Sequence, residues 1–500
     1  MGNAVKELRE HLAEIHDIGK AIGVLGWDQQ TYMPARGGPH RAEQISTLSR
    51  LAHAKFTSDR TATLLDAAEP EVASLPEKHD DRCLVRIVRR DYDRARKLPE
   101  AFVAAWARDR VLSNQVWRQA RPANDFAAFR PHLEKMVDYA RRAADFYGYE
   151  DHPYDALLEG YEPGMRTADV RRIFDAIRPE QVALVRAIVE RPEPRTDFLH
   201  RDYSVEAQAG FGLRIAQDYG YDLTRGRLDT SPHPFATSFG RDDVRITSRY
   251  DRNGLSEGLF AILHETGHAL YEMNTAASLG RTPLARGCSM VFHESSSRMW
   301  ENVVGRSRPL WEHYFPQLRQ TFPDALGDVT VEEFYRAINK VQPSLIRVVA
   351  DEVTYNLHIM LRFDLELELV TDKMRAADLP EAWAAGMRSY LGITPPDDRD
   401  GVMQDSHWSS GSFGYFPTYA LGNVLSAQIY QTALAARPEI PSEIREGRFQ
   451  TLREWLVDNV YRHGRKFLPH ELVQRVTGRP LEPQPYLLYL KAKYSQIYGL

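Results

Sequence analysis

One five-residue stretch, His264-Glu265-Thr266-Gly267-His268, constrains the fold of this 500-residue chain more than any other. It has the form H-E-x-x-H, and the apolar spacing around it predicts a helix. Residues four apart project from the same helical face, so the two imidazoles can bind one metal ion. Glu265 lies one residue further round, where it can act as a base toward water instead of binding metal. The chain is therefore expected to fold so that one helix face lines a polar site.

A zinc hydrolase needs a third protein ligand and one open coordination position. The segment 293–298 offers Glu294, which lies in a second helical pattern. Two crossing helices would bring Glu294 to His264 and His268 and complete a site with two His ligands and one Glu. Alternatively, Glu294 forms an ion pair with Arg298, four residues later on the same helical face. Spacing alone leaves both interpretations open.

Helical periodicity dominates the rest of the chain. Apolar residues that step by three and four predict a first helix running from Val5 to Ile22. Further helical patterns cover residues 101–118, 128–147, 169–190, 204–219, 331–342, 346–370 and 451–461. No segment is long or biased enough in composition to be a disordered linker. We therefore expect a mostly α protein in which residues 1–500 form one catalytic domain.

A short segment before the metal helix has a different pattern. Phe235–Phe239 and Val244–Tyr250 flank a polar turn, and the second run alternates with a period of two. This pattern predicts a β-hairpin, with an irregular loop as the alternative. A small sheet beside the site is suited to hold an extended peptide by main-chain hydrogen bonds at its edge.

Charge and composition exclude several classes of protein. The formal net charge of −5 gives no general basic field for nucleic acid. No apolar run approaches the roughly 20 residues of a membrane helix, and the amino terminus lacks the apolar region of a secretory signal. Two distant cysteines, Cys83 and Cys288, give no disulfide framework. We expect a cytoplasmic protein that binds neither nucleic acid nor membranes.

Six short motifs follow one another along the chain. They are HPF (His233–Phe235), DVRIT (Asp243–Thr247), HETGH (His264–His268), HES (His293–Ser295), IRVVAD (Ile346–Asp351) and GVMQDSHW (Gly401–Trp408). In these motifs and their order the chain resembles, over nearly its whole length, the carboxypeptidase Taq family of zinc metallocarboxypeptidases. Trp27–Pro34 is also similar to family sequence, and we interpret it as packing. Ser296 stands where the family usually has Gln, which puts in doubt only a hydrogen bond outside the metal ligands.

The resemblance implies a fold and an activity. It implies a large helical fold with a long central cleft and a small sheet beside the zinc site, similar to neurolysin and angiotensin-converting enzyme. It also implies one zinc ion per chain, with cobalt as a possible substitute, and Glu294 as the third ligand. The implied reaction is the release of single residues from free peptide carboxyl termini, with broad specificity, by a homodimer.

A carboxypeptidase must recognise a free α-carboxylate. Arginine is suited to this because its planar fork donates two parallel hydrogen bonds. Arg347 and Arg245 are the candidates, and Gln404 is a third. Asp351 stands four residues after Arg347, so a helix-surface ion pair is the alternative, and the same pair could hold Arg347 in place. Arg245 could instead anchor the hairpin through Asp243.

Peptide hydrolysis builds an oxyanion, and donors placed where that charge develops can lower the barrier by ~3 kcal/mol each. His233, directly before the hairpin, is one candidate donor. Residues 407–419 are rich in Gly, Ser and aromatic residues and resemble the His-and-Tyr segment of neurolysin-type peptidases. Within it, Tyr419 is the first candidate and Tyr415 the second, with core packing as the alternative for each. His407 is a candidate donor, a supporting group or a core histidine.

The sequence therefore predicts a zinc metallocarboxypeptidase. His264, His268 and Glu294 would bind the metal, Glu265 would be the general base, and Arg347 would place the carboxyl terminus of the peptide. One alternative is a zinc endo-oligopeptidase, which needs no carboxylate-binding Arg. The other is a non-catalytic helical zinc-binding scaffold. Glu265 argues against the scaffold, because a structural site does not need a general base.

Overall fold

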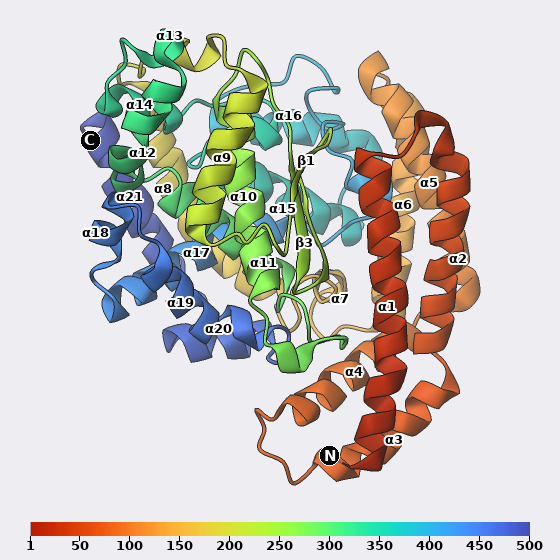
Figure 1. The fold of residues 1–500 in the computed structure, drawn as a ribbon. Helices are drawn as coiled ribbons and strands as arrows, with labels where there is room; N and C mark the ends of the chain where they lie inside the picture. Colours follow the sequence, from red (N-terminus) through yellow and green to blue (C-terminus); the bar gives the residue numbers. More distant parts are fainter. Residues whose placement is uncertain (1) are drawn as a thin grey trace. The chain divides into compact units, whose positions relative to one another are not determined.

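The computed structural model describes residues 2–500, which Figure 1 draws as a ribbon. The chain divides into two compact units, each assembled from segments distant in sequence. Unit 1 contains the chain up to Arg96, Arg195–Ile338 and Ile429–Gly478. Unit 2 contains Lys97–Pro194, Asn339–Gln428 and Arg479–Leu500. The expected mostly α fold is confirmed, because helices make up both units and, within residues 2–500, strands occur only in a small sheet.

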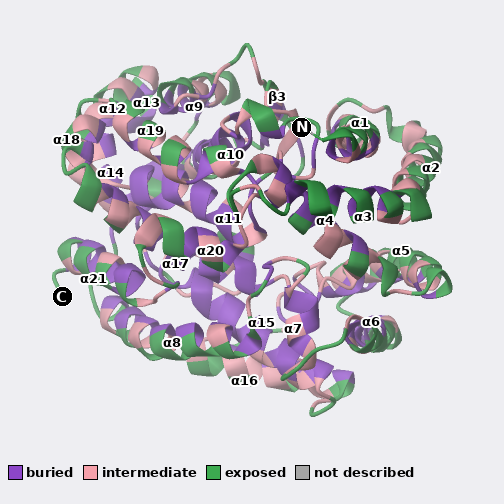
Figure 2. Cartoon of the chain, turned by 90° about the horizontal axis from the view of Figure 1, so that it is seen from below, coloured by how far each residue is buried: buried purple, intermediate pink, exposed green. Residues whose placement is uncertain are grey.

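Unit 1 opens with four helices and a short 3-10 turn: α1 (Asn3–Thr31), η1 (Ala35–Gly37), α2 (Gly38–Phe56), α3 (Asp59–Val72) and α4 (Asp80–Arg96). The predicted first helix is confirmed and continues to Thr31. The first half of its apolar stripe is buried, since Val5, Leu8 and Leu12 are at most 2% exposed and join one apolar cluster with residues of α3 and α4. The second half, Ile15, Ile18 and Ile22, is half-buried. By contrast, α2 has no buried residue (Figure 2).

The sheet of unit 1 has three strands in the order β1-β3-β2. β2 (Ala236–Gly240) pairs antiparallel with β3 (Asp243–Ser248), which confirms the predicted hairpin. β1 (Leu228–Thr230) pairs parallel with β3 and was not predicted, because three residues give too little alternation to detect. Val244 and Ile246 of the central strand are fully buried and pack in one apolar cluster with residues of the following helix, α10 (Ser256–Met273).

The other elements of unit 1 are η2 (Asp197–His200), α9 (Val205–Tyr219), α10 (Ser256–Met273), η3 (Ala277–Leu279), α11 (Met290–Arg298), the π-helix η4 (Met299–Val304), α12 (Arg308–Thr321), α13 (Pro323–Leu326), α14 (Val331–Ile338), α18 (Ile440–Arg445), α19 (Gln450–Asn459), η8 (Tyr461–His463) and α20 (Pro469–Thr477). α10 carries the H-E-x-x-H motif and packs against α9, α11, β2 and β3. Most residues of α10 are buried (Figure 2).

Unit 2 is built from helices and 3-10 turns. They are α5 (Glu100–Ala123), α6 (Phe126–Tyr147), α7 (Pro153–Leu158), α8 (Thr167–Val189), η5 (Arg347–Val349), α15 (Tyr355–Val370), η6 (Ala376–Asp378), α16 (Leu379–Leu391), η7 (Trp408–Ser410), α17 (Pro417–Ala436) and α21 (Gln484–Tyr498). The unit boundary falls within α17, after Gln428. α15 is buried along nearly its whole length (Figure 2) and packs against α6, α7, α8 and α16.

The predicted helix over residues 346–370 is wrong in its first part. Arg347–Val349 forms only a 3-10 turn, and α15 begins at Tyr355. The Asp351 carboxylate accepts hydrogen bonds from the backbone N–H groups of Val353 and Thr354, at 2.9 and 3.0 Å, and so starts the helix there. The other predicted helices are confirmed, although α14 ends at Ile338 rather than at residue 342. Across residues 2–500, no helix combines the length and apolar character needed to cross a membrane.

Candidate functional site

Three side chains of unit 1 converge where α10 meets α11. His264 and His268 come from α10, and Glu294 comes from α11. Their possible ligand atoms all lie within 4.8 Å of one another. The Nε2 atoms of His264 and His268 lie 3.8 and 3.6 Å from Oε2 of Glu294. Tetrahedral ligands bonded at 2.0–2.1 Å are about 3.4 Å apart, so the two nitrogens and one oxygen fit a single small divalent ion.

The two helices can approach this closely because Gly267 has no side chain. A Cβ atom at Gly267 would lie 2.6 Å from both the Ser296 carbonyl oxygen and the Ser297 Cα atom. The Ser296 hydroxyl donates to the Gly267 carbonyl at 2.6 Å and also contacts the Tyr461 hydroxyl at 2.7 Å. Ser296, the departure from the family pattern, therefore ties α11 to the metal helix.

Carboxylates and a guanidinium hold the ligands in place. Nδ1 of His264 lies 2.8 Å from Oε2 of Glu301, which leaves Nε2 directed at the ligand cluster. Arg298 donates to Oε1 of Glu294 at 2.6 Å and to Glu301 at 3.1 Å. The ion pair between Arg298 and Glu294 is thus real and compatible with a ligand role, because Oε2 still faces the imidazoles. Burial opposes ionisation of Glu301, but Arg298 and His264 outweigh it and lower its pKa to about 2.

The motif residue Glu265 is 6% exposed. Burial raises its pKa to about 7, the range in which a general base works best at neutral pH, and a bound divalent cation would lower it again. Burial and the neighbouring His293 lower the pKa of His268 well below its usual value. Burial also opposes protonation of His264, but Glu294 and Glu301 outweigh it and raise the pKa. At neutral pH His268 therefore offers the neutral ring that metal binding requires.

In unit 2, Arg347 lies in a buried polar cluster. Its Nη2 atom donates to Oδ1 of Asp405 at 2.7 Å, Nε donates to the same oxygen at 3.2 Å, and Nη1 donates to the Tyr355 hydroxyl at 2.9 Å. Arg362, which is fully buried, donates to the other oxygen of Asp405 at 2.7 Å. The alternative ion pair between Arg347 and Asp351 is not formed, because the Asp351 carboxylate accepts from the backbone N–H groups of Gln342, Val353 and Thr354.

The side-chain amide of Gln404 contacts both arginines of this cluster. Its Oε1 atom accepts from the Arg347 backbone N–H at 2.9 Å and from Arg362 at 2.8 Å. Its Nε2 atom donates to the carbonyls of Leu345 and Asp400 at 2.9 and 3.0 Å. These four bonds use the whole capacity of the amide. An effect of Gln404 on substrate binding would therefore pass through Arg347.

The segment 407–419 forms an aromatic group in the same unit. The hydroxyl of Tyr419 lies 3.4 Å from Nε2 of His407, and the rings of Tyr415 and Tyr419 are 5.2 Å apart. Burial lowers the pKa of His407 to about 4, so its ring is neutral at neutral pH. Within residues 2–500, Nδ1 of His407 is buried without a hydrogen-bond partner. The Arg347 guanidinium carbon lies 5.0 Å from the centre of the Tyr419 ring.

A buried carboxyl group fixes this segment to α15. Glu366 accepts hydrogen bonds from the Trp408 indole N–H at 2.8 Å, the Gly414 backbone N–H at 3.1 Å and the Tyr154 hydroxyl at 2.6 Å. Burial raises the pKa of Glu366 to about 7. Glu366 thereby holds both ends of the loop between His407 and Tyr415.

The two remaining candidates lie in unit 1. Arg245 forms a two-bond ion pair with Asp243, at 2.8 and 2.9 Å, and its guanidinium carbon lies 4.3 Å from the centre of the Trp27 ring. This geometry matches the hairpin-anchoring alternative and gives Trp27 the packing role expected for it. His233 is exposed in the bend before β2, and its carbonyl accepts from the Ser231 hydroxyl at 2.7 Å.

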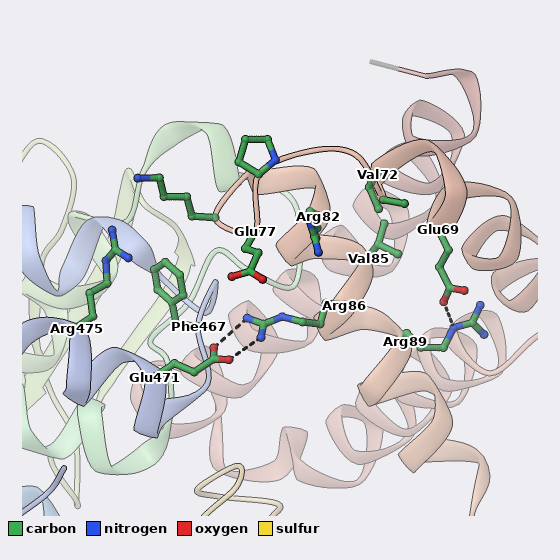
Figure 3. A pocket seen from close by; sticks show the side chains of 13 residues that line it. Glu69, Val72, Glu77, Arg82, Val85, Arg86, Arg89, Phe467, Glu471 and Arg475 are labelled. Atoms are coloured by element: carbon green, nitrogen blue, oxygen red, sulfur yellow. Dashed lines mark hydrogen bonds and ion pairs between the residues drawn. The ribbon is translucent and has the colours of Figure 1, made fainter. Parts of the chain in front are cut away.

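A separate cavity of about 910 Å³ lies in unit 1 among α3, α4 and α20 (Figure 3). Arg86 and Glu471 form an ion pair of 2.7 Å at its wall, and Arg475 lies over the Phe467 ring at 4.9 Å. None of the metal-cluster residues lines this cavity, so it is not the metal centre.

Sequence reasoning missed several supporting residues, among them Asp405, Glu301 and Glu366. Glu301 has a detectable signal, because it follows Glu294 by seven residues and so returns to the same helical face. Asp405 stands inside the GVMQDSHW motif, but no local spacing indicates which arginine it binds. Glu366 is one of three acidic residues of α15, beside Asp364 and Glu368, and only the fold shows which of them buried donors reach.

Comparisons with known proteins match nearly the whole chain to carboxypeptidases of one family. The family model described as carboxypeptidase Taq (M32) metallopeptidase matches residues 7–494. Thermostable carboxypeptidase 1 of Thermus thermophilus is 41% identical over 506 residues, and carboxypeptidase 1 of Bacillus subtilis is 36% identical over 496, each alignment covering 99% of both chains. The crystal structure of the M32 carboxypeptidase from Deinococcus radiodurans superposes with a TM-score of 0.97 at 43% identity and covers 100% of both chains.

Proposed function

The chain belongs to the carboxypeptidase Taq (M32) family of metallopeptidases and is thus a metallocarboxypeptidase with a His-His-Glu metal site, and we propose which metal ion it binds, what each site residue does and how it cleaves peptides. The ion is zinc, one per chain, held by His264, His268 and Glu294. The reaction is the release of single residues from free peptide carboxyl termini with broad specificity. The single observation that carries the proposal is the convergence of two Nε2 atoms on one oxygen of Glu294.

Glu265 is the general base of the proposed reaction. A bound zinc ion supplies a Lewis acid that activates water and polarises the scissile carbonyl. Glu265 takes a proton from the attacking water and delivers it to the leaving amine. Its burial supports this role, because removal from water raises the pKa of the Glu265 carboxyl above the usual value and makes the carboxylate a stronger base.

Arg347 is the proposed carboxylate-binding residue. A guanidinium has five N–H donors, and the contacts with Asp405 and Tyr355 use one on each of the three nitrogens. The two that remain, on Nη1 and Nη2, suffice for a two-bond contact with a carboxylate. Arg245 is the second candidate, although its pairing with Asp243 and its stacking on Trp27 favour a structural role.

Tyr419 and His407 are the proposed donors to the developing oxyanion, with Tyr415 and His233 as further candidates. The contact between the Tyr419 hydroxyl and His407, and the unpartnered Nδ1 atom of His407, support a role beyond packing. A buried polar atom without a partner is costly, so a substrate group that pairs with it would be favoured.

We further propose that both units act together as one catalytic domain, since the family match runs through both. We also propose that the enzyme is a cytoplasmic homodimer. The family resemblance supports the dimer, and two buried free cysteines are compatible with a reducing compartment. Sedimentation of the purified protein tests the dimer.

The test of the function is a digest of one peptide in two forms, with a free or an amidated carboxyl terminus, read by mass spectrometry. A carboxypeptidase should give a ladder of single-residue losses from the free acid and almost none from the amide. Internal fragments from both forms would favour the endo-oligopeptidase. Cleavage that a chelator does not abolish, or no cleavage after zinc loading, would reject the metal-dependent reaction.

A further inference from the structure

His293 lies between the metal ligand His268 and a carboxylate that binds no metal. Its Nδ1 atom is 2.8 Å from Nδ1 of His268, and its Nε2 atom is 2.8 Å from Oε1 of Glu272. We propose that His293 is a positioning residue, which fixes the tautomer and ring orientation of His268 and thereby sets the affinity of the metal site. The inference rests on the ligand assignment of the proposed function.

Only one distribution of hydrogens fits both contacts when metal is bound. Nε2 of His268 faces Oε2 of Glu294 at 3.6 Å, so Nε2 is its ligand atom. A neutral imidazole that binds metal through Nε2 carries its hydrogen on Nδ1. His268 must then donate to Nδ1 of His293, and His293 must carry its own hydrogen on Nε2 and donate it to Glu272. A chain of two oriented imidazoles therefore ends on a carboxylate.

The surroundings of His293 hold the ring in this orientation. A Cβ atom at Gly287 would lie 2.5 Å from Cδ2 of His293, so only glycine leaves room for the ring. The Tyr271 ring stacks on His293 with centres 5.5 Å apart and planes 29° apart. The Gly287 backbone N–H also donates to Oε1 of Glu272 at 3.0 Å, which fixes the terminal acceptor. Together these contacts hold the His293 ring in one orientation.

The two imidazole ligands thus differ in their support. His264 contacts the carboxylate of Glu301 directly, at 2.8 Å, whereas His268 reaches the carboxylate of Glu272 only through the neutral ring of His293. Partners of this kind orient a ligand and raise its basicity, and their removal typically costs 10–100-fold in metal affinity or activity. His293 should therefore matter for metal binding although it is not itself a ligand.

The test measures zinc affinity by competition with a chromophoric chelator. His293→Phe keeps a ring but removes both hydrogen bonds, and it should weaken zinc binding by about 10–100-fold. His293→Gln offers an oxygen to His268 and an N–H to Glu272, and it should recover most of that loss. Tyr271→Phe is the matched control, because it keeps the ring that stacks on His293 and removes only a hydroxyl that accepts from the Cys288 backbone N–H at 3.1 Å, so the zinc affinity should stay unchanged. The absorption spectrum of the Co²⁺ form should shift in His293→Phe and not in the control.

Equal zinc affinity in His293→Phe and wild type would overturn the inference, and so would a loss in His293→Gln as large as in His293→Phe. If His293→Phe does not fold, Glu272→Ala takes its place, because it leaves the imidazole without its acceptor; wild-type affinity in that variant overturns the inference as well. His264→Ala distinguishes a failure of the ligand assignment from a failure of the role given to His293. If wild type and His264→Ala bind zinc equally, the ligand assignment fails; if only the His293 variants are unaffected, this inference alone fails.

Discussion

Asp405 binds Arg347 across 58 residues of sequence, with Oδ1 2.7 Å from Nη2 and 3.2 Å from Nε. The same carboxylate accepts from Arg362. One negative charge therefore lies between two guanidinium groups, and the trio keeps a net positive charge. Burial opposes ionisation of Asp405, but the two guanidiniums outweigh it and hold its pKa far below the usual range. The trio thus holds Arg347 rigidly and still attracts an anion.

The first prediction concerns the preference for a free carboxyl terminus. Arg347→Ala should narrow the ratio of kcat/KM between free-acid and amidated peptides, because the discriminating contact is lost. Arg347→Lys keeps the charge but not the planar fork, so its ratio of kcat/KM between the two peptides should stay close to that of Arg347→Ala. Zinc content should not change. If Arg347→Ala retains the wild-type ratio, the same assay on Arg245→Ala decides whether Arg245 binds the carboxylate.

A second prediction concerns the stability of unit 2. Asp405→Asn leaves two buried guanidiniums without their counter-charge and should lower the free energy of unfolding by about 3–5 kcal/mol. Asp351→Asn is the control, because Asp351 accepts only from neutral donors, namely the backbone N–H groups of Gln342, Val353 and Thr354 and the Thr354 hydroxyl. Its replacement leaves no buried charge unpaired, so the loss should be smaller, about 1 kcal/mol. Urea unfolding followed by circular dichroism measures both. Similar losses in the two variants would contradict the role given to Asp405.

The metal ligands can be tested together. His264→Ala and Glu294→Ala should each lose bound zinc and peptidase activity in parallel, because each removes one of three protein ligands. Metal analysis of the dialysed protein and a free-acid peptide assay give the two quantities. Stoichiometric zinc with full activity in either variant would refute the ligand set.

Glu265→Gln separates metal binding from chemistry. The amide keeps the size of the side chain but cannot accept the proton, so the variant should hold zinc and lose at least ~10²-fold in kcat. Single-turnover rates and zinc content are measured on the same sample. A turnover near that of wild type would show that another group is the base.

The pKa of about 7 at Glu366 predicts a dependence of stability on pH. The folded state holds this proton more tightly than the unfolded chain, whose Glu pKa is 4.5. The stabilising contribution is therefore complete below pH 4.5 and is lost as the pH rises through 7, by about 3 kcal/mol in all. Glu366→Gln should gain stability relative to wild type between these pH values, as measured by urea unfolding at pH 4.5, 6 and 8. A constant difference between the two proteins would exclude this titration.

Sequence patterns predicted the metal helix because the spacing of His264 and His268 is a local property of one helix. They failed for residues 346–354, where Val348 and Val349 fit an apolar helical stripe but are 67% and 66% exposed on a 3-10 turn. The partner of Arg347 was also missed, because a contact across 58 residues depends on the fold of the whole unit. Local periodicity thus predicted the elements, and contacts distant in sequence determined how the candidate residues are held.

The contact of Gly267 with the backbone of α11 limits how this enzyme can vary. Any side chain at position 267 would push Ser296 and Ser297 away and carry Glu294 with them. The neighbouring Thr266 makes no such backbone contact through its hydroxyl, which donates to the Ile262 carbonyl at 2.7 Å within α10 itself. Thr266 is itself fully buried, so a saturation library over the two variable positions of the motif should return only small residues, such as serine, alanine or valine, at 266 and only glycine at 267.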